Sequence, residues 1–408
     1  MLRCGLLGEK LGHSYSPAIH ALLGDYEYKL YEKAPGEVER FLREGTFDGL
    51  NVTIPYKKTV LPLCAELSEE ARAIGSVNTL VRRPDGTLCG DNTDAWGFRY
   101  LLSSAGIDPA GKKALVLGSG GASVMAVYVL QTLGAGSVTV ISRTGENNYQ
   151  NLDRHADAEL IVNTTPVGMY PHNGEAAVDL RAFPRCRGVV DVVYNPARTA
   201  LLLQAEALGI PCAGGLSMLV GQALRSSEQF QNRTLDAALV GSITQKLRRE
   251  SGNIILVGMP GCGKSTIAAR LHELTGRPVL DADERVTELA GKPIPAIFAE
   301  SGEEGFRALE TQALSELGKA SGAIIATGGG CVTREENYPL LHQNGTIFWL
   351  RRDTALLPRD GRPLSQGADL QAMYEKRAPL YKRFADQCID NDRTVDAAAR
   401  DILEVYGI

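Results

Sequence analysis

The hydrophobic positions of the chain fall into short continuous runs that are separated by stretches with helical patterning. The middle of the chain has four such runs: "KALVLG" (113–118), "SVTVIS" (137–142), "ELIVNTT" (159–165) and "GVVDVVY" (188–194). Helical segments, such as 122–134 and 198–208, alternate with them. Continuous apolar runs are typical of parallel strands that are buried on both faces, so the pattern predicts a doubly wound α/β domain.

A second series of apolar runs predicts a second α/β unit. Its runs are "NIILVG" (253–258), "PVLDAD" (278–283), "AIIATGGG" (323–330) and "TIFWLRR" (346–352). Between the two series, 216–230 and 234–249 have the pattern of two helices, and Ser251-Gly252 interrupts the pattern before the next strand. We therefore predict a boundary at about 250–252 with a short linker.

Composition excludes some classes of protein. The chain has 408 residues, of which 44% are hydrophobic and 22% are charged, as in a globular protein of several domains. The net charge of -5 argues against nucleic acid as a partner, because binding to its backbone needs a basic surface. The eight cysteines and six histidines show no metal-ligand spacing, so we expect a reducing compartment and no structural zinc. Without a signal-peptide or membrane-spanning pattern, we expect a cytoplasmic protein that does not bind a membrane.

A Gly-rich stretch, "VLGSGGAS", follows the first predicted strand of the middle domain. Glycines there allow a tight turn, and the free N–H groups at the start of a helix bind a pyrophosphate. The residues expected to contact a dinucleotide are Gly118, Ser119, Gly120, Gly121 and Ala122. The alternative is a glycine turn that only packs, since Ser123 stands where the dinucleotide motif usually ends in Gly or Ala.

The end of the next predicted strand indicates which dinucleotide is bound. Arg143, flanked by Ser142 and Thr144, stands where an NAD site would offer a carboxylate to the ribose hydroxyls. A guanidinium group there suits the 2′-phosphate of NADP, although a solvated surface arginine is the alternative. The expected cofactor is therefore NADP(H).

The first third of the chain contains four dense polar stretches: "GHSYSPAIH" (12–20), "NVTIPYKK" (51–58), "GSVNTL" (75–80) and "GDNTDAWGF" (90–98). Hydroxyl and amide side chains at strand ends suit a ligand with several hydroxyls and a carboxylate, although each stretch alone could be turn chemistry. In this order, with "NTTPVGM" (163–169), "YNPARTALL" (194–203) and "GLSMLVGQA" (215–223), they resemble the shikimate dehydrogenase family over residues 3–245.

This resemblance implies that Lys57 and Asp94 form a catalytic pair. Hydride delivery to a ketone leaves an alkoxide, which a positioned ammonium group can stabilise and protonate. From the residues alone, Lys57 could be a solvated lysine and Asp94 a helix cap. The resemblance also implies Gly215 at the cofactor and a substrate site formed by Ser14, Ser16, Asn51, Thr53, Asn78, Tyr194 and Gln222.

The sequence departs from this family at three points. Ala95 replaces a usual glycine, no second basic residue follows Arg143, and the stretch 143–163 is short enough to predict a trimmed βαβ crossover. The preferences for NADP over NAD and for shikimate over quinate therefore stay open.

The second Gly-rich loop, "GMPGCGKS" (258–265), is a complete G-x-x-x-x-G-K-S motif between a strand and a helix. Its backbone N–H groups would hold the phosphates of ATP, Lys264 would reach the β/γ oxygens, and Ser265 would bind Mg²⁺. The predicted ATP-binding residues are Gly261, Cys262, Gly263, Lys264, Ser265 and Thr266.

Motifs beyond this loop, "LDADERV", "SGEEGFRALE", "ATGGG", "DGRPL" and "KRAPLY", resemble shikimate kinase over residues 253–408. The resemblance implies that Asp281 supports Mg²⁺ through water, and that Arg362 on a lid stabilises the transferred phosphoryl group. The adenine contacts and a role of Arg359 in the short lid stay open. The residues implied to hold shikimate are Asp283, Arg307, Gly329, Gly330 and Arg377. The alternatives are a helix cap at Asp281, a simple turn at the glycines, and pairing of Arg307 with Glu303 or Glu310.

Together these patterns predict four parts, all of α/β character. They are a substrate-binding domain (1–104), a Rossmann-like NADP domain (105–214), C-terminal helices that pack back on the substrate domain (215–250), and a P-loop kinase domain with a parallel sheet (253–408). The expected activities are reduction of 3-dehydroshikimate with NADPH and phosphorylation of shikimate with ATP. The alternatives are a dehydrogenase that also accepts quinate or NAD, and a kinase-like half that only senses shikimate. Monomer and homodimer both stay open.

Overall fold

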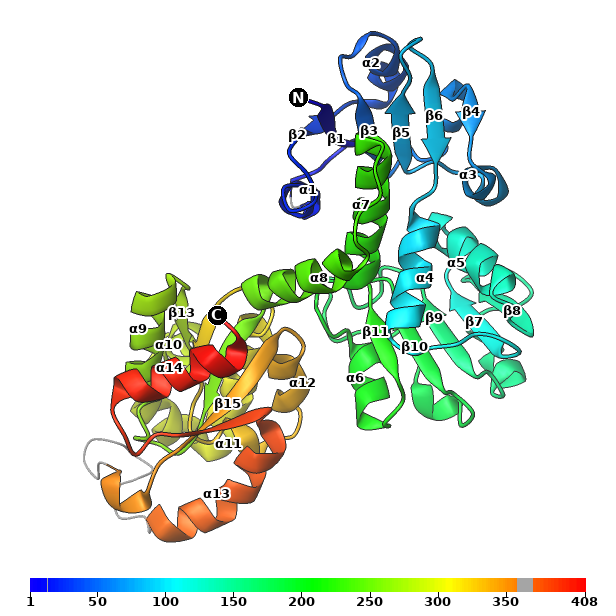
Figure 1. The fold of residues 1–408 in the computed structure, drawn as a ribbon. Coiled ribbons are helices and arrows are strands. Elements are labelled where there is room, and N and C mark those ends of the chain that lie inside the picture. The colour runs from blue at the N-terminus through cyan, green and yellow to red at the C-terminus, as the bar shows by residue number, and fades with distance from the viewer. Residues whose placement is uncertain (13, 358–369) are drawn as a thin grey trace. The chain divides into compact units, whose positions relative to one another are not determined.

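The computed structural model of the chain describes residues 1–12, 14–357 and 370–408. The chain forms two compact units (Figure 1). Unit 1 comprises Met1–Gly168, Ala176–Tyr194 and Gln204–Lys246, and unit 2 comprises Met169–Glu175, Asn195–Leu203 and Leu247–Ile408. Arg359 and Arg362, which the sequence placed in the kinase site, lie outside the described residues.

The first sheet of unit 1 is mixed and has the strand order β2-β1-β3-β5-β6-β4. Its strands are β1 (Arg3–Gly8), β2 (Glu27–Glu32), β3 (Gly49–Val52), β4 (Glu66–Leu67), β5 (Thr79–Arg82) and β6 (Leu88–Asp91). β1 pairs in parallel with β2 and β3, whereas β5 runs antiparallel to β3 and β6. Three short helices accompany the sheet: α1 (Ser16–His20), α2 (Val38–Glu44) and α3 (Glu69–Ile74).

The second sheet of unit 1 is entirely parallel, with the order β11-β10-β9-β7-β8. Its strands are β7 (Lys113–Leu117), β8 (Ser137–Ile141), β9 (Leu160–Asn163), β10 (Gly188–Asp191) and β11 (Cys212–Gly214). The four predicted central runs are thus confirmed as parallel strands. Only a 3-10 turn, Leu152–His155, occurs between β8 and β9, so this crossover is trimmed. The helices of this part are α4 (Asp94–Ser104), α5 (Gly121–Thr132) and α6 (Ala200–Ala207).

Two helices follow, α7 (Leu216–Gln231) and α8 (Ala238–Ser251). α7 contacts α1, α4 and β5, and Figure 1 shows it running from the start of α8 to the first sheet. The buried side of α7 includes Gln222, Ser226 and Phe230, so this helix brings polar as well as apolar groups to the first sheet. α8 ends at Ser251 and the next strand begins at Asn253, which leaves Gly252 as the connection.

Unit 2 contains a parallel five-stranded sheet in the order β13-β14-β12-β15-β16. Its strands are β12 (Asn253–Val257), β13 (Val279–Asp281), β14 (Ile324–Ala326), β15 (Gly345–Arg351) and β16 (Gln387–Asp390). Its helices are α9 (Lys264–Thr275), α10 (Ala282–Ala290), α11 (Ile294–Leu317), α12 (Asn337–His342), α13 (Leu370–Phe384) and α14 (Val395–Tyr406). The second series of apolar runs is confirmed as β12 to β15. Segments 169–175 and 195–203 join this unit through bonds such as Arg198 N to Gln343 O, at 2.9 Å.

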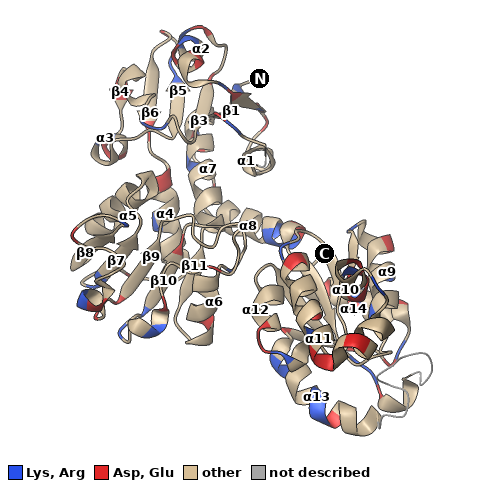
Figure 2. Cartoon of the chain, turned by 180° about the vertical axis from the view of Figure 1, so that it is seen from behind, with Lys and Arg blue, Asp and Glu red and all other residues tan. Residues whose placement is uncertain are grey.

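Basic and acidic residues are intermixed along the described elements of both units, as Figure 2 shows. All eight cysteines lie in the described ranges and are free thiols. Among the described helices, none combines the length and the apolar character that crossing a membrane requires.

Candidate active sites

The structure brings Lys57 and Asp94 together. Lys57 lies in the turn region after β3, and Asp94 is the first residue of α4. The Lys57 Nζ donates a hydrogen bond to Asp94 Oδ2 at 2.5 Å, and the two side chains are 30% and 17% exposed. The carboxylate therefore holds the ammonium group in one orientation, while the ammonium stays accessible to a ligand.

Asn78 fixes the loop that carries Asp94. Its Oδ1 accepts hydrogen bonds from Thr93 N at 2.7 Å and from Thr93 Oγ1 at 3.1 Å. Its Nδ2 lies 3.5 Å from Gln222 Oε1 on α7. Both amide side chains are buried, so Asn78 joins β5, the start of α4 and α7 at one point.

Other predicted substrate residues lie at the ends of neighbouring elements. Ser16 is the first residue of α1, and its N–H donates to Ser14 Oγ at 3.2 Å. Thr53 follows β3, and its N–H donates to the carbonyl of Leu7 on β1. The ring of Tyr194 packs edge-on against the ring of Tyr15, the residue between Ser14 and Ser16 in the sequence, with 5.7 Å between the ring centres. Burial raises the pKa of Tyr194.

The first Gly-rich loop has the backbone that a pyrophosphate site requires. Gly118 follows β7 with a φ of +105°, a conformation that other residues rarely adopt. α5 begins at Gly121, so the first N–H groups of this helix have no intrahelical acceptor. A Cβ atom at Gly120 or Gly121 would meet no other heavy atom of the described protein within 4 Å, so this side of the loop is open to a ligand. These features fit the dinucleotide.

Arg143 lies just after β8, at the same carboxyl edge of the sheet as Gly118. Arg143 is exposed, and the hydroxyl of the neighbouring Ser142 donates to the carbonyl of Thr144 at 2.6 Å. Burial raises the pKa of Tyr149, and the nearby Arg143 charge opposes that rise. Gly215 precedes α7, and its N–H donates to the carbonyl of Val193. The guanidinium is thus available to a phosphate, although the exposure is also that of a surface arginine.

The second Gly-rich loop shows the backbone of a phosphate-binding loop. Gly258, Gly261 and Gly263 have φ values of +149°, +83° and +97°. Lys264 begins α9 and is only 8% exposed. Its Nζ donates to the carbonyls of Gly258 at 2.9 Å and Met259 at 3.1 Å, which holds the ammonium group over the loop. The loop fits a nucleotide triphosphate.

A hydroxyl of this loop contacts a carboxylate at the end of β13. Ser265 Oγ donates to Asp281 Oδ2 at 3.2 Å; Ser265 is the second residue of α9, and Asp281 is the last residue of β13. Asp281 Oδ1 also accepts the N–H of Asp283 at 2.8 Å, so the helix-cap alternative for this residue is present as well. A hydroxyl and a carboxylate in contact match the ligands that Mg²⁺ prefers.

Arg307 on α11 is buried together with a glutamate. Its Nη1 donates to Glu310 Oε2 at 2.7 Å and its Nη2 to Glu303 Oε1 at 3.2 Å, so the pairing that the sequence left open is present. Burial raises the pKa of Glu310, and the Arg307 charge opposes this effect. Burial alone would lower the pKa of Arg307, but the two glutamates raise it. The guanidinium therefore remains charged inside the protein.

The glycines after β14 are packed against this pair. A Cβ atom at Gly330 would overlap the guanidinium of Arg307, and one at Gly328 would meet Glu310 and Asp283. Arg377 Nη1 donates to the carbonyl of Gly329 at 3.2 Å. The turn is therefore glycine-rich because charged side chains approach its backbone closely, which goes beyond a simple turn.

Sequence reasoning missed two residues in unit 2, one that supports the glycine turn after β14 and one that supports the phosphate-binding loop. Tyr381, one helical turn after Arg377 on α13, donates its hydroxyl to the carbonyl of Gly329. Asn391 follows β16, and its Nδ2 donates to the carbonyl of Cys262 at 2.5 Å. The spacing of four residues after Arg377 could have indicated Tyr381, because such residues share a helix face.

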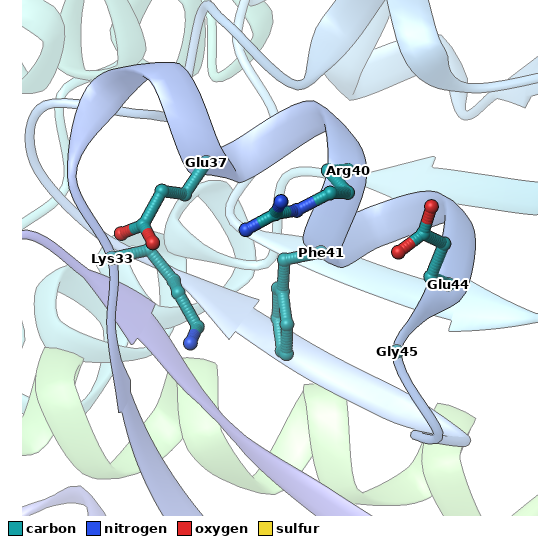
Figure 3. A pocket seen from close by; sticks show the side chains of 6 residues that line it. All are labelled: Lys33, Glu37, Arg40, Phe41, Glu44 and Gly45. Carbon is teal, nitrogen blue, oxygen red and sulfur yellow. The ribbon is translucent and has the colours of Figure 1, made fainter.

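An open hollow on unit 1 lies apart from these residues. Figure 3 shows it beside α2, lined by Lys33, Glu37, Arg40, Phe41, Glu44 and Gly45. The Lys33 ammonium lies 5.3 Å from the centre of the Phe41 ring. Its lining comes from α2 and the residues that flank it, and includes none of the predicted catalytic or binding residues.

Comparisons with known proteins match the N-terminal and the C-terminal parts of the chain to two different families. A family model for the shikimate dehydrogenase substrate binding domain matches residues 6–80, and one for shikimate kinase matches residues 260–406. A shikimate dehydrogenase (NADP(+)) of Clostridium perfringens is 34% identical over 265 residues, which cover 60% of this chain and 97% of that relative.

Solved structures resemble the same part of the chain. A chorismate mutase/shikimate 5-dehydrogenase fusion protein from Clostridium acetobutylicum is 36% identical, with a TM-score of 0.57 over 60% of this chain and 97% of that one. A shikimate 5-dehydrogenase from Thermus thermophilus, in complex with NADP(H) and shikimate, is 31% identical, with a TM-score of 0.55 over 60% and 99% of the two chains. The chain therefore belongs to the shikimate dehydrogenase family in its N-terminal part and continues into a shikimate kinase domain.

Proposed function

We propose that the chain catalyses two successive reactions, the NADPH-dependent reduction of 3-dehydroshikimate to shikimate and the ATP-dependent phosphorylation of shikimate to shikimate 3-phosphate. The observation that carries this proposal is that one chain holds a Lys57–Asp94 contact and a glycine loop open to a dinucleotide in one unit, and a complete phosphate loop with a buried arginine in the other. The product of the first reaction would be the substrate of the second. NADP(H), ATP and Mg²⁺ are the cofactors of this proposal.

In the reduction, bound NADPH would supply a hydride to the ketone carbon of the substrate. Lys57 Nζ donates a proton to the oxygen that becomes the hydroxyl of shikimate, since an ammonium both stabilises and protonates a developing alkoxide. Asp94 holds that ammonium at 2.5 Å and keeps its direction fixed. Neutral hydroxyl and amide side chains would orient the hydroxyls and the carboxylate of the substrate. These side chains belong to Ser14, Ser16, Asn51, Thr53, Asn78, Tyr194 and Gln222.

In the phosphorylation, bound ATP would supply the phosphoryl group, with Mg²⁺ neutralising part of its charge. Ser265 and Asp281 would hold the metal, and Lys264 would move from its loop carbonyls to the phosphate oxygens. Arg307 and Arg377 would bind the carboxylate of shikimate, because a guanidinium matches a carboxylate in geometry and charge. Asp283, next to the glycines after β14, would orient the hydroxyl that is phosphorylated.

We also propose four functional parts with the limits 1–104, 105–214, 215–250 and 253–408. The first two would bind substrate and NADP(H), and the third would close the substrate side. α7 supports the third part, because it contacts α1, α4 and β5, which all belong to 1–104, the part on which it would pack back.

The competing possibility, a kinase-like half that only senses shikimate, makes a different prediction. A sensor needs neither the Lys264 ammonium held over the loop nor the Ser265–Asp281 contact. One incubation of the purified chain with 3-dehydroshikimate, NADPH and Mg-ATP distinguishes the two. Shikimate 3-phosphate should form, as detected by mass spectrometry, while NADPH absorbance falls.

Two single variants act as matched controls for each other in this assay. Lys57→Met should stop at 3-dehydroshikimate but still phosphorylate added shikimate. Lys264→Met should consume NADPH at the normal rate and accumulate shikimate. If the unmodified chain consumes NADPH but accumulates shikimate, the kinase proposal is wrong and the sensor explains the second unit. Comparing quinate with shikimate, and NAD with NADP, then measures how selective the dehydrogenase is.

A further inference from the structure

A tyrosine that is not among the predicted site residues makes a hydrogen bond to one of them. Tyr28 is on β2, and its hydroxyl donates to Asn51 Oδ1, on β3, at 2.8 Å. In the register of the sheet, Tyr28 and Gly49 are both paired with Cys4 of β1. Asn51 is two residues beyond Gly49 and therefore points to the same face of the sheet as Tyr28. The tyrosine side chain thus reaches across β1 to the predicted substrate residue.

The Tyr28 hydroxyl belongs to a chain of hydrogen bonds. Asn51 Nδ2 donates to Ser226 Oγ at 2.9 Å, and the Ser226 hydroxyl donates to the carbonyl of Gln222 at 2.9 Å. Desolvation raises the pKa of Tyr28 well above its ordinary value, and a hydrogen bond with the Ser16 side chain opposes that rise. Two predicted substrate residues therefore lie on one chain that begins at Tyr28: Asn51 through its side-chain amide, and Gln222 through its backbone carbonyl.

This chain fixes which way the Asn51 amide points. Ser226 uses its only proton on a backbone carbonyl, so its oxygen can only accept from Asn51, and the partner must be the NH₂ group. The phenol proton of Tyr28 then goes to the remaining carbonyl oxygen. Asn51 Nδ2 also donates to Thr79 Oγ1 at 3.5 Å. If the phenol is removed, Asn51 Oδ1 loses the Tyr28 donor, and the amide loses one of the contacts that distinguish its ends.

The Tyr28 ring is itself held in place. His20 on α1 is 1% exposed and stacks on this ring, with 4.0 Å between the ring centres and 11° between their planes. His20 Nδ1 lies 2.6 Å from the hydroxyl oxygen of Tyr26, which donates its own proton to Ser227. Burial lowers the pKa of His20 to about 3, so the imidazole is neutral at physiological pH. The Tyr28 ring is thus stacked against a buried, uncharged neighbour.

We propose that Tyr28 is a positioning residue of the dehydrogenase site, which acts on substrate binding through the orientation of Asn51. This inference rests on the proposed reduction of 3-dehydroshikimate. The Tyr28 hydroxyl bonds to Asn51 and not to Lys57 or Asp94. Its loss should therefore weaken the binding of the substrate and leave the proton transfer nearly intact.

The test compares Tyr28→Phe with Tyr26→Phe in the full chain, without ATP, by NADPH oxidation. Both changes remove one phenol oxygen from the same polar cluster, but Tyr26 is bonded to His20 and Ser227 rather than to a predicted substrate residue. Tyr28→Phe should raise the KM for 3-dehydroshikimate about tenfold and change kcat by less than about threefold, which corresponds to one hydrogen bond. The KM for NADPH should not change, and Tyr26→Phe should leave both KM values within about twofold.

A double variant shows whether Tyr28 acts through Asn51. In an Asn51→Ala background, Tyr28→Phe should have almost no additional effect on the KM for 3-dehydroshikimate, because the amide that it orients is gone. Additive effects, or an unchanged KM in Tyr28→Phe together with normal turnover, would overturn the positioning role alone. An unmodified chain that does not oxidise NADPH with 3-dehydroshikimate would refute the proposed function, and the inference with it. Thermal unfolding of both phenylalanine variants serves as the folding control.

Discussion

Replacing Arg307 with methionine should destabilise unit 2, because it leaves a buried carboxylate without its main partner. Glu310 is fully buried, and its Oε2 accepts from Arg307 at 2.7 Å. Glu303, the other partner of Arg307, is 57% exposed and loses little when the pair is broken. Removing one member of a buried ion pair typically costs 3–5 kcal/mol, so we expect a loss of about 3 kcal/mol.

The assay is urea unfolding followed by the fluorescence of Trp349, which is 8% exposed on β15. A Trp96→Phe background removes the other of the two tryptophans in the chain. With a urea dependence of about 2 kcal/mol/M, the expected loss shifts the midpoint down by about 1.5 M. The reduction of 3-dehydroshikimate in unit 1 should stay unchanged, which controls for general damage.

The cause can be tested by neutralising Glu310 as well. Arg307→Met combined with Glu310→Gln should be more stable than Arg307→Met alone, since a neutral buried pair has no uncompensated charge. The effect of pH follows from the same argument. Burial raises the pKa of Glu310 in the folded state above the ordinary 4.5 of the unfolded chain. At pH values between the unfolded-state and folded-state pKa, the folded protein therefore binds more protons than the unfolded chain, and its stability falls as the pH rises.

Without Arg307, the pKa of Glu310 should rise further, so the deficit of Arg307→Met relative to the unmodified chain should be largest near neutral pH. It should shrink as the pH falls through about 4.5, because Glu310 is protonated in both states only below that pH. A double variant that is less stable than the single one, or a deficit that grows in acid, would refute the charge argument.

Three further predictions concern single groups. Arg143→Gln should raise the KM for NADPH about tenfold and leave the KM for NADH nearly unchanged, as measured by initial rates, because only NADPH carries the 2′-phosphate. Asp281→Asn should raise the Mg²⁺ concentration needed for half-maximal phosphorylation several-fold, as measured by a metal titration, without affecting NADPH oxidation. Burial lowers the pKa of His20 from 6.5 to about 3. Between these two pH values, the unfolded chain binds a proton at this residue that the folded unit does not, so the stability of unit 1 should fall as the pH is lowered. The slope from this residue is up to about 1.4 kcal/mol per pH unit, and His20→Asn should flatten it in urea titrations between pH values of about 4 and about 6.5.

The sequence was informative where structure depends on local patterns. Buried parallel strands such as β7 and β12 are continuous apolar runs, and both Gly-rich loops could be placed between a strand and a helix. β11 and β16 were missed, because the first has three residues and the second, "QCID", carries polar residues at a sheet edge. Edge strands are short and polar by nature, so they lack the apolar signal.

The candidate sites were predictable to the extent that their residues lie in contiguous motifs. The contact between Lys57 and Asp94 joins residues 37 positions apart, and only the resemblance to a family indicated that they meet. Tyr28 gave no signal, because "EYKLYE" has the pattern of an ordinary half-exposed strand. Its importance depends on the sheet order β2-β1-β3, which aligns it with Asn51 across a third strand.

The two units would recognise the same metabolite with different chemistry, and this difference explains their internal charges. In unit 1 the groups proposed around the Lys57–Asp94 pair are hydroxyls and amides, whose burial is compensated by hydrogen bonds such as those of Asn51 and Asn78. In unit 2 the proposed carboxylate ligand is a buried guanidinium, which has to stay charged before any substrate arrives. Glu310 supplies the balancing charge, and the cost of burying that carboxylate appears as its raised pKa. An arginine site for shikimate therefore requires a buried acid behind it, whereas a site built of neutral donors requires a network that fixes their orientation.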